Sequence, residues 1–163
     1  MIRRLHHSAM RCSDTGRTRE FYEGFLGLPL AAALDLHQTA TGRSARVLHS
    51  FFRLGDGSFL AFFEVPDAPF EFKAQHDFDL HIALEVSPDH LQRMVGKARA
   101  LGIETRGITD HHFIHSAYFR DPDGYVVELC AKTPGHDEVM RDAAATARGV
   151  IDAWQGRKEA VAA

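Results

Sequence analysis

Two stretches of the chain, LHHSAMRCSD at residues 5–14 and DLHIALEVSP at residues 79–88, share a pattern that decides the fold. Three pairs of identical residues recur at one offset of 74 (7 to 81): His7 and His81, Ala9 and Ala83, Ser13 and Ser87. A repeated unit of this kind predicts two equivalent modules packed along a shared seam. Each module then carries one histidine on an equivalent strand.

Each copy also repeats one order of elements, namely a strand, a helix and three further strands. The helices are expected to begin at the caps Ser13 or Asp14 and Ser87, and to end at Gly27 and Gly102. The expected strands are residues 5–12, 28–36, 47–54 and 59–65 in the first copy and 81–86, 103–107, 114–120 and 125–131 in the second. The chain is therefore predicted to be an α+β protein of two tandem βαβββ modules.

The last two strands of each copy are joined at an Asp-Gly pair, which suits a tight hairpin: Asp56-Gly57 and Asp123-Gly124. Their offset is 67 (57 to 124), because the first copy has a longer polar segment at 37–46, which we interpret as a loop. Counting four residues from each hairpin glycine gives Ala61 in the first copy and Glu128 in the second. The carboxylate is thus present in one copy only.

The domain boundaries follow from this alignment. We expect a first module at 1–65, a linker at 66–78 marked by Pro66 and Pro69, and a second module at 79–132. Residues 133–163 form a C-terminal extension, in which apolar residues at helical intervals predict an amphipathic helix over 137–158. This helix either covers apolar surface or serves as a lid or dimer contact, and the whole chain is expected to form one compact domain.

The composition favours a small-molecule ligand. A formal net charge of -3 over 163 residues argues against nucleic acid or an anionic membrane as the main partner. Neither a spanning apolar run nor a signal peptide is evident, so a cytoplasmic location is expected. Cys12 and Cys130 have no paired spacing and are interpreted as buried, reduced thiols, whereas 11 histidines favour metal or acid/base chemistry.

The repeat identifies three candidate metal ligands. His7, His81 and Glu128 stand at equivalent positions on strands expected to line one seam, and two imidazoles with one carboxylate form the ligand set of non-haem Fe(II) oxygenases. Such a set leaves positions open for substrate and dioxygen. Glu64 is an alternative fourth ligand if its strand bulges, although regular alternation turns it away from the face of Ala61. His6 points to the other side of its strand from His7.

At this point the chain resembles the vicinal oxygen chelate superfamily, which includes glyoxalase I, fosfomycin and bleomycin resistance proteins and extradiol dioxygenases. The motifs that carry the resemblance are LHH followed by SD, FYEGFLGL at 21–28, HIALEVS at 81–87 and YFRDPDGYVVEL at 118–129. The resemblance covers roughly residues 5–132. It implies that the paired modules form an open, barrel-like mixed sheet around a divalent metal.

The end of the second copy, residues 109–128, is similar to the signature of extradiol ring-cleaving enzymes, except that Ala117 stands where a bulkier residue is usual. This similarity implies that Glu128 is the iron carboxylate, Tyr118 a hydrogen-bonding group beside the site and His111 the acid/base histidine. A histidine can accept a proton from a catechol and return it, since it titrates near neutral pH. His112 and His115 compete with His111 for this role.

The function expected from the sequence is extradiol-type cleavage of a small aromatic diol by dioxygen. The expected cofactor is Fe(II), with manganese, zinc or nickel as alternatives, and the expected assembly is a homodimer. Two other functions stay open: a glyoxalase-like isomerase that uses Glu64 or another base, and a metal-free module that binds a hydrophobic ligand. The pocket of such a module would be lined by phenylalanines, among them Phe51, Phe52, Phe59, Phe62, Phe63, Phe70, Phe72 and Phe78.

Overall fold

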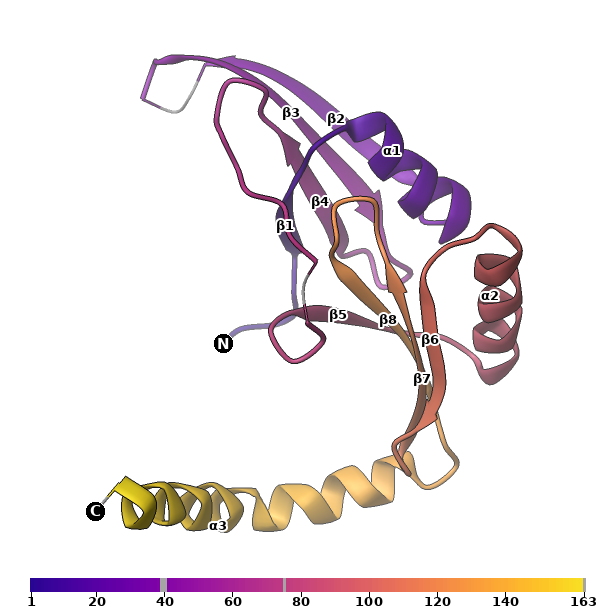
Figure 1. Cartoon of the computed structure of the whole chain (residues 1–163), viewed down its shortest axis with the longest axis vertical. Helices are drawn as coiled ribbons and strands as arrows, with labels where there is room; N and C mark the ends of the chain where they lie inside the picture. Colours follow the sequence, from indigo (N-terminus) through magenta and orange to yellow (C-terminus); the bar gives the residue numbers. More distant parts are fainter. Residues whose placement is uncertain (39–40, 75, 163) are drawn as a thin grey trace.

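The computed structural model describes residues 1–38, 41–74 and 76–162, with side chains up to residue 158. Its elements follow the predicted order (Figure 1). The first module contains β1 His7–Cys12, α1 Thr15–Arg19, the π-helix η1 Glu20–Phe25, β2 Leu30–Gln38, β3 Ser44–Arg53 and β4 Phe59–Glu64. The second contains β5 His81–Glu85, α2 Pro88–Ala100, β6 Thr105–Asp110, β7 Ile114–Arg120 and β8 Val126–Lys132, and α3 His136–Ala162 follows it.

Each module forms a four-stranded mixed sheet with the same topology. The strand orders are β1-β4-β3-β2 and β5-β8-β7-β6. In both sheets the first strand runs parallel to the last, and the other neighbours are antiparallel. The predicted α+β class and the paired βαβββ architecture are confirmed. The strands described here form two open sheets and no closed barrel.

The register of the parallel pairs confirms the alignment of the two copies. Ala9 lies opposite Ala61 in the first sheet, and Ala83 lies opposite Glu128 in the second. Ala9 and Ala83 are one of the matched pairs of the repeat. Glu128 therefore occupies the position that Ala61 has in the first module.

Both helices begin and end where the sequence indicated. A carboxylate oxygen of Asp14 accepts a hydrogen bond from the Arg17 N–H at 2.8 Å, and Ser87 Oγ accepts one from the His90 N–H at 3.2 Å. Gly27 and Gly102 follow the helices with φ angles of 77° and 68°, a conformation that glycine adopts without a Cβ penalty. These local signals fix where the chain enters and leaves each helix.

The segment 37–46 differs from the predicted loop. β2 continues through Gln38 and β3 begins at Ser44, its partner in the sheet, while residues 39–40 lie outside the described part. All residues of β2 are exposed, so polar side chains cost little there and backbone pairing can extend the hairpin. The loop is therefore shorter than predicted: residues 37–38 and 44–46 belong to an exposed β-ribbon, and residues 41–43 lie outside its strands.

The two modules share one hydrophobic core. Its buried side chains come from both, among them Tyr22, Phe52, Phe62, Leu91, Ala98, Phe119 and Val127. At the seam the Tyr22 hydroxyl donates to Asp121 Oδ2 at 3.0 Å, and the Ser13 N–H donates to Asp123 Oδ2 at 3.1 Å. The FY and DPDG motifs of the sequence therefore meet across the seam and join the modules.

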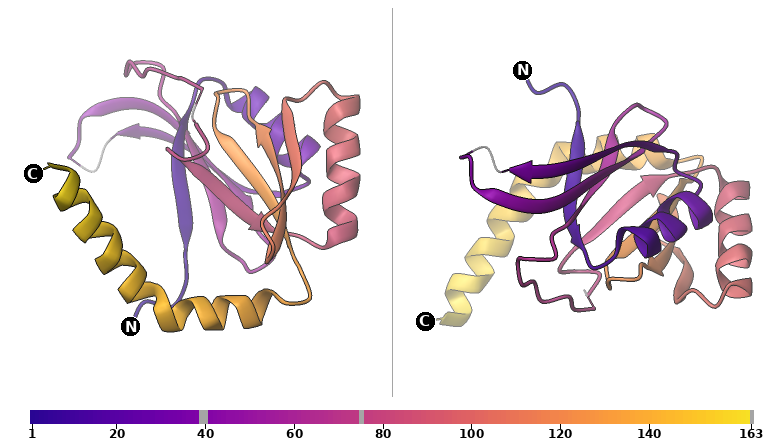
Figure 2. Two further views of the ribbon diagram at one scale, coloured as in Figure 1. Left: turned by 60° about the horizontal axis from the view of Figure 1, so that its bottom comes forward. Right: turned by 90° about the horizontal axis from the view of Figure 1, so that it is seen from above.

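The C-terminal helix α3 leaves the end of β8 and projects away from both sheets (Figures 1 and 2). It confirms the predicted helix and extends it in both directions. Its apolar side chains Val139, Met140, Val150, Ile151 and Trp154 are exposed, and the described core contains no residue of α3.

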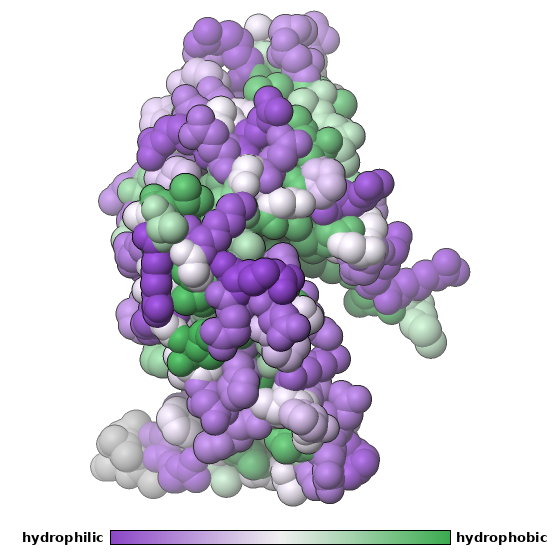
Figure 3. Space-filling model, turned by 90° about the vertical axis from the view of Figure 1, so that its right-hand side faces the viewer, coloured by the Kyte–Doolittle hydropathy of each residue, from purple (hydrophilic) through white to green (hydrophobic). Residues whose placement is uncertain are grey.

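The side of the molecule that carries α2 is mainly hydrophilic (Figure 3). No helix within the described ranges is long and apolar enough to cross a membrane.

Candidate metal centre

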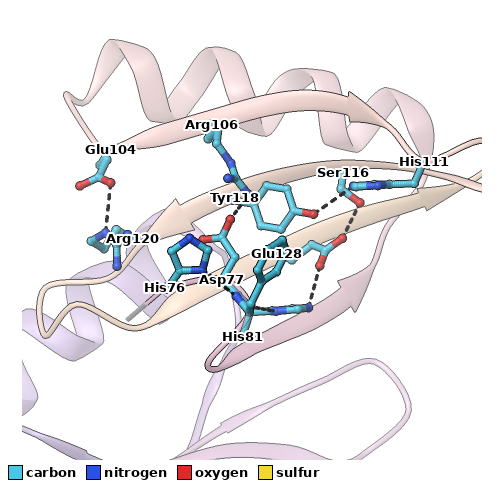
Figure 4. A network of polar contacts seen from close by, with 11 residues as sticks. His76, Asp77, His81, Glu104, Arg106, His111, Ser116, Tyr118, Arg120 and Glu128 are labelled. Carbon is cyan, nitrogen blue, oxygen red and sulfur yellow. Dashed lines mark hydrogen bonds and ion pairs between the residues drawn. The ribbon is translucent and has the colours of Figure 1, made fainter. Parts of the chain in front are cut away.

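A histidine and a glutamate meet on the open face of the second sheet (Figure 4). Val127 and Leu129 of β8 enter the core beside α2, so Glu128 between them points to the opposite face. His81 begins β5, and its Nε2 lies 3.2 Å from Glu128 Oε2. The carboxylate is only 4% exposed, and its other oxygen, Oε1, accepts a hydrogen bond from the Ser116 hydroxyl. The other oxygen of Glu128, Oε2, is thus the one that can contact His81 or a cation bound next to His81.

The second nitrogen of His81 is also engaged. Its Nδ1 lies 2.5 Å from the Asp77 backbone carbonyl oxygen, which can only accept, so Nδ1 carries the proton. In the neutral ring Nε2 then presents a lone pair to Glu128 Oε2, and two electron-pair donors face each other. A cation between them removes this repulsion, and it is either a proton on Nε2 or a metal ion.

The spacing of these two atoms fits a metal ion. Neighbouring ligands of an octahedral ion, each about 2.1 Å from it, lie about 3 Å apart. The separation of His81 Nε2 and Glu128 Oε2 is 3.2 Å. The pair could therefore hold a divalent metal after small movements, with a nitrogen and an oxygen donor that suit iron, manganese, zinc or nickel.

The structure does not bring His7, the third predicted ligand, to this pair. His7 lies on β1 in the other sheet, where its Nδ1 is 2.8 Å from His6 Nδ1. Within the described residues, no group of three or more His, Cys, Asp or Glu side chains could hold a metal ion. One chain therefore presents two of the three predicted ligands as a pair and the third on a separate sheet.

His7 stands beside a cluster of aromatic rings on the open face of the first sheet. Its ring centroid is 5.8 Å from that of Phe51, which in turn lies 5.9 Å from the Phe59 ring. His49 stacks on Phe63 with centroids 3.6 Å apart and ring planes at 9°. Of the phenylalanines that could line a pocket, Phe51, Phe59 and Phe63 are half-buried here, whereas Phe52 and Phe62 belong to the core. The first sheet thus offers an apolar wall next to a histidine.

Tyr118 and His111 lie together next to Glu128. Tyr118 of β7 is the cross-strand neighbour of Glu128, and its hydroxyl is 3.1 Å from His111 Nε2. His111 precedes β7 in the loop, as the signature spacing required. Burial, and then the negative charge of Glu128, raise the pKa of Tyr118, so its phenol stays protonated. The Tyr118 hydroxyl and His111 Nε2 share one hydrogen bond, whose donor is set by the His111 tautomer.

The two competing histidines lie elsewhere. His112 is exposed in the loop between β6 and β7, with a positive φ of 71°. His115 is exposed on β7 and its Nε2 is 3.6 Å from Asp110, on the other face of the strand from Ser116. Of the three candidates, His111 is the one that the structure joins to Tyr118.

Glu64 has a structural partner. Its Oε2 accepts a hydrogen bond from the Thr15 N–H at 2.7 Å, at the first turn of α1. A carboxylate in this position stabilises the start of a helix. The regular pairing of β4 with β1 shows no bulge that would turn Glu64 towards the face of Ala61.

Sequence reasoning missed three residues of the site. Ser116 lies two residues before Tyr118, so strand alternation could have placed it on the same face. Arg106 of β6 has its guanidinium carbon 4.4 Å from the centre of the Tyr118 ring, and it pairs with Asp77 of the linker. Asp77 carried no readable signal, because its carboxylate pairs with a residue of a distant strand and its contact with His81 is made by the backbone carbonyl. A cavity of about 350 Å³ borders Asp77, Arg106 and Tyr118.

The fold and the site define a class: proteins of two fused βαβββ modules with a His–Glu pair on an open sheet face. A family model described as the Glyoxalase/Bleomycin resistance protein/Dioxygenase superfamily matches residues 4–129. The chain belongs to this superfamily, as the resemblance of its motifs implied. No curated protein matches it in sequence.

Solved structures support the same fold. A glyoxalase/dioxygenase from Nostoc punctiforme is 26% identical over 80% of this chain and 92% of its own, with a TM-score of 0.63. The fosfomycin resistance protein FosX from Mesorhizobium loti is 22% identical over 85% and 99%, with a TM-score of 0.62. A mutant of FosX from Listeria monocytogenes, complexed with Mn(II) and 1S,2S-dihydroxypropylphosphonic acid, is 20% identical over 84% and 98%, with a TM-score of 0.61.

Proposed function

We propose that the chain is a metal-dependent enzyme whose site is completed between two copies. His81 and Glu128 of one copy hold a divalent metal, Fe(II) in this proposal, and His7 of a second copy supplies the third ligand. The approach of His81 Nε2 to Glu128 Oε2 carries the proposal, because the other nitrogen and the other oxygen of the pair already have partners.

A homodimer follows from the two open faces of the chain. One face carries His7 with aromatic rings, and the other carries the His–Glu pair with polar groups. β1 and β5, the strands that bear the two histidines, each lie at an edge of their sheet. Exposed strand edges next to half-buried aromatic rings favour packing against another chain. In a two-fold symmetric dimer, one type of contact would bury both open faces.

The proposed reaction is extradiol cleavage of a catechol-like diol, in which the carbon–carbon bond beside the diol breaks and both atoms of dioxygen enter the product. Iron bound to two nitrogens and one carboxylate supplies electron transfer between the diol and dioxygen and keeps positions open for both. The aromatic wall around His7 suits the ring of such a substrate. The carboxylate of Glu128 is held by Ser116 while the substrate binds.

His111 and Tyr118 are the groups that move the proton. A proton leaving a diol hydroxyl can pass to the Tyr118 oxygen while the tyrosine's own proton moves to His111 Nε2, 3.1 Å away. The same path returns the proton to the ring-opened product. Proton transfer of this kind typically contributes about 100-fold to 10,000-fold to the rate. The Tyr118–His111 hydrogen bond lies beside the pair of His81 and Glu128. This position favours acid/base catalysis at the site over binding of a ligand without reaction.

The comparisons support a metal-dependent protein of this superfamily. The Nostoc protein is described as a glyoxalase/dioxygenase, and a FosX structure contains Mn(II). The substrate and the choice of iron rest on the ligand set and on the similarity of residues 109–128 to the ring-cleavage signature. A cytoplasmic location remains part of the proposal, and the free thiols of Cys12 and Cys130 are consistent with it.

Anaerobic reconstitution with Fe(II), followed by a panel of substituted catechols and dioxygen, tests the reaction. We expect a yellow ring-opened product with at least one catechol, and His111→Ala should lower the rate by about 100-fold or more. His115→Ala is the matched control, because His115 is exposed on the other face of β7. Bound metal with no ring-opened product across the panel would favour an isomerase, and full turnover by His111→Ala would remove His111 from the mechanism.

Mixing two inactive variants tests the shared site. If His7 acts on the metal of another copy, co-expressed His7→Ala and His81→Ala chains form heterodimers with one intact site. Random pairing then restores about a quarter of the wild-type sites, as measured by bound metal. If each site lies within one chain, mixing restores none.

A second candidate function is binding of a hydrophobic ligand, because a larger cavity lies between the modules. Its volume is about 550 Å³, and seven leucines contribute to its wall: Leu5, Leu26, Leu28, Leu54, Leu60, Leu84 and Leu129. An apolar fluorescent dye should then bind wild-type protein and His81→Ala equally well, with no dependence on metal. Failure of the dye to bind would eliminate this candidate.

A further inference from the structure

The linker between the modules contacts the candidate metal centre. Residues 76–79 form a compact turn, in which the Asp79 and Leu80 N–H groups donate to the His76 carbonyl. The turn places Asp77 beside both His81 and Arg106 (Figure 4). The Asp77 side chain is 14% exposed, although it belongs to a connecting segment. A segment that only connects two modules is expected to expose its charged side chains. The mostly buried carboxylate of Asp77 beside the candidate metal centre therefore indicates a role for this residue.

Asp77 makes two different contacts with the site. Its backbone carbonyl accepts the His81 Nδ1–H at 2.5 Å, and its carboxylate pairs with the Arg106 guanidinium. The first contact orients the imidazole and leaves Nε2 as the electron-pair donor towards Glu128. The second contact ties the turn to β6, so that the carbonyl stays where His81 needs it.

Arg106 extends the same connection to Tyr118. Its guanidinium carbon lies 4.4 Å from the centre of the Tyr118 ring, a cation–π distance. One ion pair therefore links the histidine ligand, through the linker turn, to the tyrosine that contacts His111. Release of Asp77 would loosen both sides of the site.

The first module lacks this arrangement. The Nδ1 of His7 lies 2.8 Å from the ring nitrogen of its neighbour His6, not against a backbone carbonyl. Only one of these two nitrogens can donate to the other, so the contact leaves open which ring carries the shared proton. His81 is thus the histidine of the repeat that a loop holds in one orientation.

We propose that Asp77 is a positioning residue for the metal centre, which fixes the orientation of His81 through its carbonyl and is itself held by Arg106. This inference rests on the proposed metal site. Groups that hold the free nitrogen of a ligating histidine typically change metal affinity by about 10-fold to 100-fold when removed. The ion pair acts here through the backbone, so its loss is expected within that range.

The test is the affinity of the full-length protein for Zn(II) and Fe(II), measured by competition with a chelator of known affinity. We expect Asp77→Ala to weaken binding by about 10-fold or more. Asp67→Ala is the matched control, because Asp67 lies in the same linker and forms an equivalent ion pair with Arg46 at 2.6 Å. That control should leave metal affinity unchanged.

Arg106→Ala removes the same ion pair from the other side. If the pair acts as a unit, the double variant should bind metal about as weakly as the weaker single variant, since the two losses overlap. In the zinc-loaded protein, the Nδ1–H of His81 should exchange with solvent faster in Asp77→Ala than in wild type, as seen in the imidazole proton spectrum. A residue with a structural role only would lower the melting temperature and leave both readouts unchanged.

The outcomes separate this inference from the function on which it rests. Wild-type protein that binds no metal would overturn both. Wild-type protein that binds metal with unchanged affinity in Asp77→Ala and Arg106→Ala would overturn the role of Asp77 and leave the metal site intact. A loss of affinity in both variants, with Asp67→Ala unchanged, is the result that supports it.

Discussion

Replacement of Tyr22 by phenylalanine tests whether the two sequence motifs at the seam hold the modules together. Tyr22 is fully buried, and its hydroxyl donates to Asp121 Oδ2 at 3.0 Å. The other oxygen of Asp121 accepts from the N–H groups of Asp123 and Tyr125. In Tyr22→Phe, the buried Oδ2 loses its tyrosine donor while the ring still packs against Phe52 and Phe62.

The expected cost follows from this geometry. A hydrogen bond to a charged group contributes about 1.5–3 kcal/mol, and a buried oxygen left without a donor adds its desolvation penalty. We expect the free energy of unfolding of Tyr22→Phe to fall by about 2–3 kcal/mol at neutral pH. Both modules should lose stability in one transition, because the bond joins them.

The pH dependence of this loss has a definite sign. Burial raises the pKa of the Asp121 carboxyl, and the Tyr22 hydroxyl opposes that shift. A carboxyl whose folded pKa lies above its unfolded value contributes stability in acid that is lost as the pH rises through the folded pKa. Removal of the hydroxyl raises the folded pKa further, so the gap between variant and wild type should be small in acid and widen towards neutral pH.

Urea unfolding of wild type, Tyr22→Phe, Asp121→Asn and the double variant at acid and neutral pH measures these quantities. The double-mutant cycle should give a coupling energy of about 1 kcal/mol or more at neutral pH. Equal unfolding midpoints for Tyr22→Phe and wild type at neutral pH, or additive losses in the cycle, would refute the role assigned to this contact.

Three further predictions concern the rest of the chain. Deletion of residues 139–163 should leave the two modules folded with one cooperative transition, because the described core contains no residue of α3; loss of that transition in a thermal melt would contradict this. Gly124→Ala should lower the free energy of unfolding by about 1–3 kcal/mol, since Gly124 has a φ of 94° and a Cβ there would meet the Lys73 carbonyl oxygen at 2.8 Å. In the control Gly149→Ala, in α3, the new Cβ meets nothing within 4 Å. Chemical denaturation should show this control to be as stable as wild type or more stable. Burial raises the pKa values of the Cys12 and Cys130 thiols, so a thiolate-specific reagent should label the folded protein slowly and faster as the pH rises; rapid labelling of both thiols at neutral pH would show that they are accessible and ionised.

The sequence predicted those features that local rules or the repeat determine. Asp14 and Ser87 cap helices through contacts three residues away, and Gly27 and Gly102 end them through their own conformation. The equivalence of Glu128 and Ala61 followed from counting within two copies of one unit. Such features depend on neighbours along the chain, so they can be recognised without the tertiary structure.

The features that escaped prediction depend on how distant segments meet. Equivalent positions placed His7 and His81 on equivalent strands, but equivalence says nothing of whether the two modules turn these strands towards one another. Asp77 reaches Arg106 across the fold, and its carbonyl contact with His81 involves no side-chain signal at all. The polar segment 37–46 predicts a longer loop than the structure has, because polarity indicates exposure, which the exposed ends of β2 and β3 share.

The amount of metal bound by protein purified without oxygen tests the central claim most directly. Wild type and the control His115→Ala should each bind about one divalent ion per chain at one class of site, with iron as the native metal. His81→Ala and Glu128→Gln should each lose that ion while remaining folded. Equal metal content in all four proteins would contradict a site built on His81 and Glu128.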